Sequence, residues 1–205
     1  MKQILTIFFC LITFYVYSQD TTFLKVHFLY GSKPLKKHKN SEKKWFGGIL
    51  GGHVGLEVEE DKILNFLPSQ EKFHVFPKND DKHSTYAIHS QPSFYAIFGG
   101  HPDSVKLAIV YMPITPKQKE IFDSIVSVYV GHPPYDYAFF GMRCGAATYE
   151  VLGQLVILPS YSYKKTSKKI FYPRKLRKRV FKIAEENNWK IIRQDGRGNR
   201  KWEKD

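Results

Sequence analysis

The chain has 205 residues, of which 42% are hydrophobic and 16% aromatic, and a formal net charge of +13. This aromatic content excludes a disordered polar chain, and the length suits one domain with a core of ordinary size. The charge is uneven, because residues 164–205 hold 16 Lys and Arg against 5 Asp and Glu, whereas residues 19–163 hold 15 against 14. We therefore divide the chain into a nearly neutral domain at 19–163 and a basic extension at 164–205.

Residues 1–18 are predicted to form a signal peptide. Lys2 gives a short positive start, residues 4–17 are almost wholly apolar, and polar sequence begins at Gln19. Such a run is typical of a secretory signal and short for a membrane span. We expect an exported protein in the periplasm, at the outer membrane or in the medium, with peripheral membrane contact left open.

Strands and turns come next in chain order. Short runs rich in β-branched and aromatic residues predict strands over 22–30, 47–58, 62–67, 84–89 and 105–114. The second and third of these strands flank an acidic turn formed by Glu59, Glu60 and Asp61, and a lysine-rich loop over 33–44 precedes them.

The helices follow in the second half of the chain. Thr115 as cap, Pro116 at the first position and Gln118 at capping-box spacing predict a helix that ends at Gly131. Apolar spacing predicts two more helices, over 144–154 and 173–189. Residues 190–202 are expected to form a hairpin that turns at Asp195-Gly196, so the basic extension is a helix and a hairpin.

Removal of the signal peptide leaves Cys144 as the only cysteine. A single thiol in an exported chain cannot form an internal disulfide, so it is a buried filler, an intermolecular link or a reactive group. The histidines do not fall at tight ligand spacings, and we expect no metal and no cofactor. No nucleic-acid-binding motif is recognisable, so no specific nucleic-acid partner is expected.

Three residues form a candidate catalytic set. Cys144 opens a predicted helix, whose N-terminus lowers the pKa of a thiol, and His53 enters an apolar strand after two glycines. An imidazole can take the thiol proton, and a side-chain amide such as that of Asn65 can fix its tautomer. A three-residue turn places Asn65 opposite Gly55, on the face of His53, whereas a two-residue turn points it away.

Several neighbours are candidates for supporting roles. Tyr135, Asp136 and Tyr137 precede the Cys144 helix and either line a substrate cleft or pack over the core. Gly145 leaves room for a substrate carbonyl at the helix start, where the backbone N–H of Cys144 is an oxyanion donor. Glu57 lies on the same face of the predicted strand as His53. It either replaces Asn65 as the orienting residue or faces solvent.

Over residues 22–160 the chain resembles the circularly permuted, NlpC-type branch of the papain-like cysteine enzymes, which includes YiiX-like proteins and the lecithin:retinol acyltransferase relatives. The resemblance rests on Gly52-His53-Val54-Gly55-Leu56, on Asn65 twelve positions after His53, and on Arg143-Cys144 at the start of a helix. It implies that Cys144 is the nucleophile, His53 its base and Asn65 the orienting residue. The acyltransferase relatives usually have a histidine and an acidic residue where this chain has Asn65 and Gly145, which favours a peptidase or amidase.

The expected fold is α+β, a permuted papain-like fold in which an antiparallel, partly barrelled sheet packs on the Cys144 helix. The expected function is hydrolysis of an amide or related acyl bond of the peptide or peptidoglycan type through a cysteine thioester. Two alternatives stay open. One is a non-catalytic module that binds an anionic envelope polymer through the basic tail. The other is a lipid acyl hydrolase or acyltransferase.

Overall fold

A computed structural model describes residues 21–42, 51–69, 74–78, 83–98 and 100–205. The predicted signal peptide and residues 47–50 of the second predicted strand lie outside these ranges. Within them, no helix is both long and apolar enough to span a membrane.

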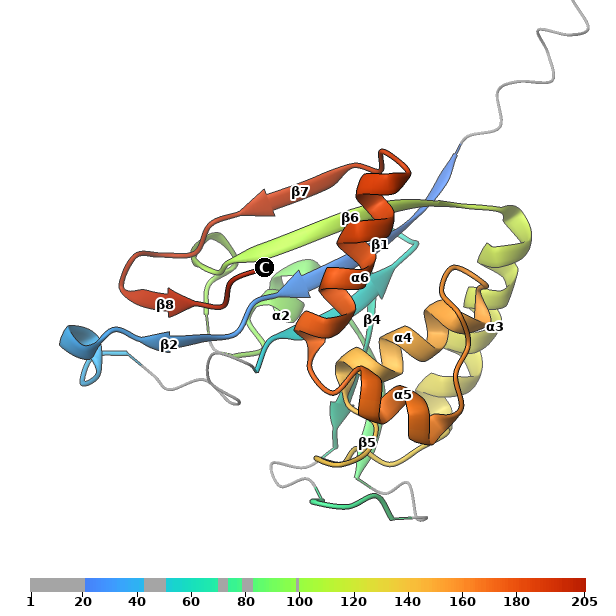
Figure 1. The fold of residues 1–205 in the computed structure, drawn as a ribbon, viewed down its shortest axis with the longest axis horizontal. Coiled ribbons are helices and arrows are strands. Elements are labelled where there is room, and N and C mark those ends of the chain that lie inside the picture. Colours follow the sequence, from blue (N-terminus) through green and yellow to red (C-terminus); the bar gives the residue numbers. More distant parts are fainter. Residues whose placement is uncertain (1–20, 43–50, 70–73, 79–82, 99) are drawn as a thin grey trace, which may run out of the picture.

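The chain has an α+β fold built on a six-stranded antiparallel sheet in the order β5-β4-β3-β1-β6-β7 (Figure 1). The strands are β1 (Thr22–Leu29), β3 (His53–Glu57), β4 (Ile63–Pro68), β5 (Ser84–His89), β6 (Leu107–Ile114) and β7 (Ile191–Gln194). The strands predicted over 22–30, 62–67, 84–89 and 105–114 are thereby confirmed. The described part of the strand predicted over 47–58 is β3.

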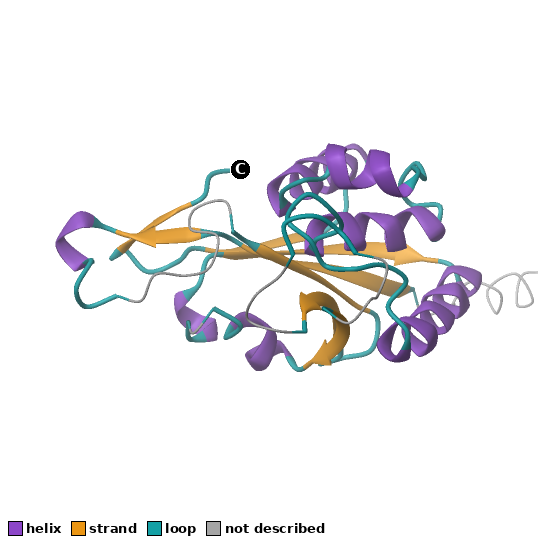
Figure 2. Cartoon of the chain, turned by 90° about the horizontal axis from the view of Figure 1, so that it is seen from below, coloured by secondary structure: helices purple, strands orange, loops and turns teal. Residues whose placement is uncertain are grey.

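Helices cover both sides of this sheet (Figure 2). They are α2 (Gln91–Tyr95), α3 (Pro116–Gly131), α4 (Cys144–Gln154), α5 (Tyr163–Lys169) and α6 (Pro173–Glu186), with short 3-10 turns η1 (Lys36–His38) and η3 (Pro102–Ser104). The three predicted helices are confirmed, and α2 and α5 were not predicted. The capping box that starts α3 is present, with Thr115 N–H donating to Gln118 Oε1 at 2.9 Å and Gln118 N–H to Thr115 Oγ1 at 3.2 Å.

The side chains of β3 alternate between two different environments. Val54 and Leu56 join the main hydrophobic core, which also holds the buried residues of α4. His53 and Glu57 point to the other side, which α2 covers and where a smaller cluster around Phe94 is buried. This alternation is the period of two that a pleated strand imposes.

The basic stretch 164–205 is built into the same fold. Leu176, Val180 and Ala184 of α6 are fully buried in the main core, because they lie on one face of the helix. The predicted hairpin over 190–202 is wrong: β7 pairs with β6, and β8 (Arg200–Trp202) pairs with β2 (Ser32–Pro34). Each strand finds its partner far away in the chain, which local turn chemistry cannot indicate.

Candidate active site

Cys144 is the first residue of α4 and is buried, with 4% of its surface exposed. Arg143 before it is extended, with φ −137° and ψ 171°, and no side chain caps the helix. The helix packs against β3 and β4 through a run of small residues, which includes Ala146 and Ala147. This close approach brings the thiol to the backbone of β3, near the start of that strand.

The thiol lies where β3 and β4 separate. Their ladder runs from Glu57↔Ile63 to Gly55↔Asn65, and β4 then continues with β5 as its partner. Beyond the end of the ladder, the Cys144 thiol donates to Gly52 O at 3.9 Å and accepts a hydrogen bond from Val54 N–H. Residues two apart on a strand present their backbone groups to the same edge. The sulfur therefore contacts the peptide groups on both sides of His53.

His53 is held by Asn65. The observed Gly55↔Asn65 register is the one that a three-residue turn requires, and Asp61 in this turn has a positive φ of 59°. The His53 Nε2 and Asn65 Oδ1 atoms are 2.9 Å apart, and both side chains are buried. The side chains predicted to lie diagonally on neighbouring strands are therefore in contact.

The tautomer of His53 follows from the remaining contacts of Asn65. Its Nδ2 donates to Ile63 O at 3.2 Å and to Ala87 O at 3.1 Å, and lies 3.1 Å from His89 Nδ1. Carbonyl oxygens only accept, so the amide nitrogen must face them and Oδ1 must face His53. His53 then carries its proton on Nε2, which leaves the lone pair on Nδ1 free to accept a proton.

Burial sets the charge of both candidate groups. Burial lowers the pKa of His53 to about 4, although its hydrogen bond with Asn65 acts in the opposite direction. Burial also raises the pKa of the Cys144 thiol, against the influence of Arg143 and of three hydrogen bonds. The prediction that the helix N-terminus lowers this pKa is wrong, because desolvation of the thiolate outweighs the dipole. At neutral pH the resting groups are a thiol and a neutral imidazole.

The imidazole and the thiol are neighbours along β3 but are not hydrogen-bonded. The His53 ring packs against Phe94 and Phe98 on the α2 side, with ring centroids 5.4 and 6.3 Å apart. Among the described residues, the thiol bonds to β3 backbone groups and to Tyr137 rather than to the His53 ring.

Glu57 lies in a separate buried network and does not contact His53. Its carboxylate accepts from Lys25 Nζ at 2.6 Å and from Gln91 Nε2 at 3.2 Å, and lies 2.7 Å from His27 Nε2. Tyr95 OH is 2.6 Å from the other His27 nitrogen. The expectation that Glu57 faces solvent or orients His53 is therefore wrong, because β1 and α2 supply its partners.

The structure places Tyr135 and Asp136 in the packing of the loop. Tyr135 is buried, its hydroxyl bonds to that of Tyr86, and its ring lies 5.2 Å from that of Phe66. The Asp136 carboxylate accepts from Lys78 N–H at 3.0 Å. Within the described residues, neither side chain contacts His53 or Asn65. Of the two expected roles, packing over the core is therefore the one that the structure has.

Gly145 has a packing role that the sequence did not indicate. A Cβ on this residue would lie 3.0 Å from Pro173 Cα, so the lack of a side chain lets the start of α6 approach α4. Its N–H also bonds to the Cys144 sulfur. The space expected for a substrate carbonyl is therefore filled, on this side, by Pro173.

Tyr137, which was expected with Tyr135 and Asp136 either to line a cleft or to pack over the core, contacts the candidate nucleophile. Its buried hydroxyl bonds to the Cys144 thiol, and the backbone of Cys144 and the guanidinium of Arg143 bond to the hydroxyl in turn. Burial raises the pKa of Tyr137, so the phenol keeps its proton and acts as a donor. Its position in an aromatic loop was the only sequence signal, and Tyr135 shares that signal.

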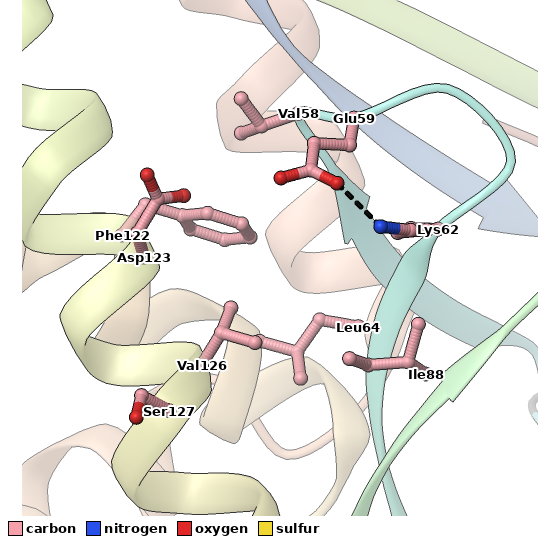
Figure 3. A pocket seen from close by; sticks show the side chains of 9 residues that line it. All are labelled: Val58, Glu59, Lys62, Leu64, Ile88, Phe122, Asp123, Val126 and Ser127. Atoms are coloured by element: carbon pink, nitrogen blue, oxygen red, sulfur yellow. Dashed lines mark hydrogen bonds and ion pairs between the residues drawn. The ribbon is translucent and has the colours of Figure 1, made fainter.

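One groove on the surface lies away from these residues. It has a volume of about 400 Å³, an apolar floor that includes Leu64, Phe122 and Val126, and a rim with the Glu59–Lys62 ion pair (Figure 3). Val58 also lines it, at the opposite end of β3 from His53. None of the candidate catalytic residues contributes to this groove.

Comparisons of the chain with protein-family models, with curated proteins and with solved structures found no match. Within the described residues, no three His, Cys, Asp or Glu side chains are grouped in a way that could hold a metal ion.

Proposed function

We propose that the chain is an exported papain-like cysteine hydrolase that cleaves an amide or related acyl bond, with Cys144 as nucleophile, His53 as base and Asn65 as the orienting residue. The observation that carries the proposal is the thiol at the end of the β3–β4 ladder, in contact with the peptide groups on both sides of His53. The fixed His53 tautomer supports it, because Nδ1 carries the free lone pair that a base requires.

The reaction begins from neutral groups. His53 Nδ1 takes the thiol proton as sulfur attacks the substrate carbonyl, and the imidazolium then returns that proton to the leaving amine. Water hydrolyses the thioester with His53 again as base, which restores the thiol. The Tyr137 hydroxyl and the backbone N–H at the start of α4 are donors for the oxyanion. The His53 ring packs on the α2 side of β3, whereas the sulfur contacts the β3 backbone from α4. His53 Nδ1 must therefore approach the sulfur past the edge of β3, at the point where β3 no longer pairs with β4.

The test is acylation of the chain by p-nitrophenyl acetate. The release of nitrophenol and the intact mass of the protein are the two measurements. One acetyl group on Cys144 is expected, and Cys144→Ala should abolish it. His53→Ala should slow acylation by about 10²- to 10⁴-fold, the usual contribution of a general base. His132→Ala, an exposed histidine, is the matched control. Acylation that is indifferent to His53→Ala would contradict the proposed base.

Substrate class is tested separately, with peptidoglycan stem peptides and phospholipid vesicles as parallel substrates. Release of new amino groups from the peptides, absent in Cys144→Ala, is the expected result. Release of fatty acid alone would instead support the lipid acyl hydrolase and overturn the amidase assignment.

A further inference from the structure

Two surface segments place aromatic side chains together beside the candidate site. Phe139 N–H donates to His74 O at 2.8 Å, and Phe140 N–H donates to Val75 O at 2.9 Å. This pairing aligns residues 74–76 with the loop that precedes α4. As a result, the Phe76 and Phe140 rings stack with centroids 5.4 Å apart and planes inclined by 27°.

These side chains are exposed to an unusual degree. Phe76 is 67% exposed, Val75 57% and Phe140 55%, with Phe139 and Tyr163 at 36% and 42%. Five of the ten large hydrophobic side chains that the described residues expose belong to this one region. Scattered apolar residues are normal on a surface, whereas a contiguous group marks an interaction site.

Lysines border the same region. Helix α5 carries Lys164, Lys165, Lys168 and Lys169, all exposed and without an acidic residue in the helix, while Thr166 and Ser167 are buried. The start of α5 and the segment that follows it contact the loop before α4: the Tyr163 hydroxyl lies beside Gly141, and Phe171, two residues beyond α5, packs against Phe139 at 5.3 Å and Phe140 at 6.1 Å. In Figure 1 α5 and the green segment 74–78 share the lower end of the molecule.

We propose that this aromatic–lysine surface, formed by Val75, Phe76, Phe139, Phe140, Tyr163 and the four α5 lysines, docks the protein on an anionic phospholipid membrane. Aromatic side chains at loop tips enter the interface between headgroups and acyl chains, and lysines next to them bind anionic headgroups. An anionic membrane offers negative headgroups to the lysines and an apolar interior to the aromatic side chains.

The surface adjoins the candidate nucleophile. The Arg143 guanidinium lies over the Phe139 and Phe171 rings, at 5.3 and 4.8 Å from their centroids, and Arg143 precedes Cys144 in the chain. Docking through this surface would therefore hold the start of α4 close to the membrane plane. The docking does not depend on the hydrolase activity, and Cys144→Ala should bind vesicles as the unchanged chain does.

The experiment measures co-sedimentation of the exported chain with vesicles of phosphatidylcholine alone or mixed with phosphatidylglycerol. We expect binding to be about ten-fold stronger or more on the mixed vesicles and to weaken as salt is raised. Phe76→Ser/Phe140→Ser should lose about ten-fold or more on the mixed vesicles. All variants share one N-terminus, so its contribution is constant.

Two matched variants test whether binding depends on this surface or on exposed apolar and positively charged residues anywhere on the protein. Val128→Ser/Val130→Ser changes two exposed apolar residues on α3, and glutamine at Lys33, Lys36, Lys37 and Lys39 removes four exposed lysines elsewhere. Both should bind like the unchanged chain, whereas glutamine at the four α5 lysines should abolish the preference for anionic vesicles. Equal losses in matched variants, or a serine double variant that binds within two-fold, would overturn the proposal. Concentration-dependent dimerisation abolished by Phe76→Ser/Phe140→Ser, without vesicle binding, would also overturn it and assign the surface to a second copy of the chain.

Discussion

The two sides of the central sheet are buried by different chemistry. On the α4 side, Leu56, Leu152 and Val180 belong to a hydrophobic core that surrounds the thiol. On the α2 side, the buried groups include two polar sets, one around Glu57 and His27 and one around His53 and Asn65. Apolar packing is non-directional, whereas hydrogen bonds fix individual atoms.

This difference assigns separate tasks to the two sides. The α4 side brings Cys144 to the edge of β3 through packing of small side chains. The α2 side determines which nitrogen of His53 carries the proton, because Asn65 is itself held by the Ile63 and Ala87 carbonyls. A candidate catalytic pair thus depends on packing for one member and on a hydrogen-bond network for the other.

The largest effect is expected for Glu57→Ala on the polar side. Removal of this carboxylate leaves buried His27 and the partly buried Lys25 without their acceptor, and breaking such a pair costs about 4 kcal/mol of the free energy of unfolding. Urea denaturation measures the loss. Glu59→Ala, which breaks the exposed pair with Lys62, is the control and should change stability little. Similar losses in both variants would show that the polar side is not buried in solution.

Leu152→Ala is the corresponding change on the apolar side. Leu152 is fully buried in the main core, and the cavity it leaves should lower the free energy of unfolding by about 3 kcal/mol. Unlike Glu57→Ala, this variant should show the same loss at each pH. Val128→Ala, at a half-exposed position of α3, should stay within about 0.5 kcal/mol. If the loss of unfolding free energy in Leu152→Ala depended strongly on pH, the α4 side would not be the purely apolar side described above.

The polar side should contribute to the pH dependence of stability through His53. The pKa of His53 is about 4 in the folded chain against 6.5 as its ordinary value, so the unfolded chain binds more protons between these limits. Stability should therefore fall as pH decreases through this window, by a total on the order of 3 kcal/mol from His53. His53→Gln should flatten the slope without abolishing it, because burial also lowers the pKa of His27. An unchanged slope in His53→Gln would place the His53 ring in solvent.

The smallest effect compares two tyrosine hydroxyls, one on each side. Tyr95→Phe removes the donor to His27 and leaves a buried nitrogen unpaired, which should cost about 1.5 kcal/mol. Tyr149→Phe removes the donor to Pro159 O at 2.8 Å, whose carbonyl is less enclosed, and should cost less. Urea denaturation of the two variants gives the order, and a reversed order would show that Tyr95 does not hold α2 on the sheet.

Several features of the candidate site were predictable from sequence. The alternation of β3 and a three-residue turn placed Asn65 beside His53, and the structure has that register. The start of α4 at Cys144 was also predicted, from apolar spacing. The pKa of the thiol was not, because a helix dipole is visible in the sequence whereas burial depends on what packs over the helix.

The C-terminal region shows the same limit for charge. Arg177 belongs to the basic stretch 164–205, yet it is buried and pairs with Glu203 at 3.0 Å. Arg200 pairs with Glu42 at 2.9 Å, across most of the chain. Net charge therefore overstated the basic surface, and the lysines of α5 are exposed members of the same stretch.

By itself, the sequence determined the strands β1, β4, β5 and β6, the capped helix α3, the helix that begins at Cys144 and the shared face of His53 and Asn65, whereas β2 lies in a stretch predicted as a loop. These depend on periodicity, capping and turn length, which act over a few residues. Only the tertiary structure decided the partners of β7 and β8, the network around Glu57, the contact of Tyr137 with the thiol, and the cluster of Phe76 with Phe140. Apart from the contact of Tyr137 with Cys144, each joins residues distant in the chain, and all of these contacts form only when the core is packed.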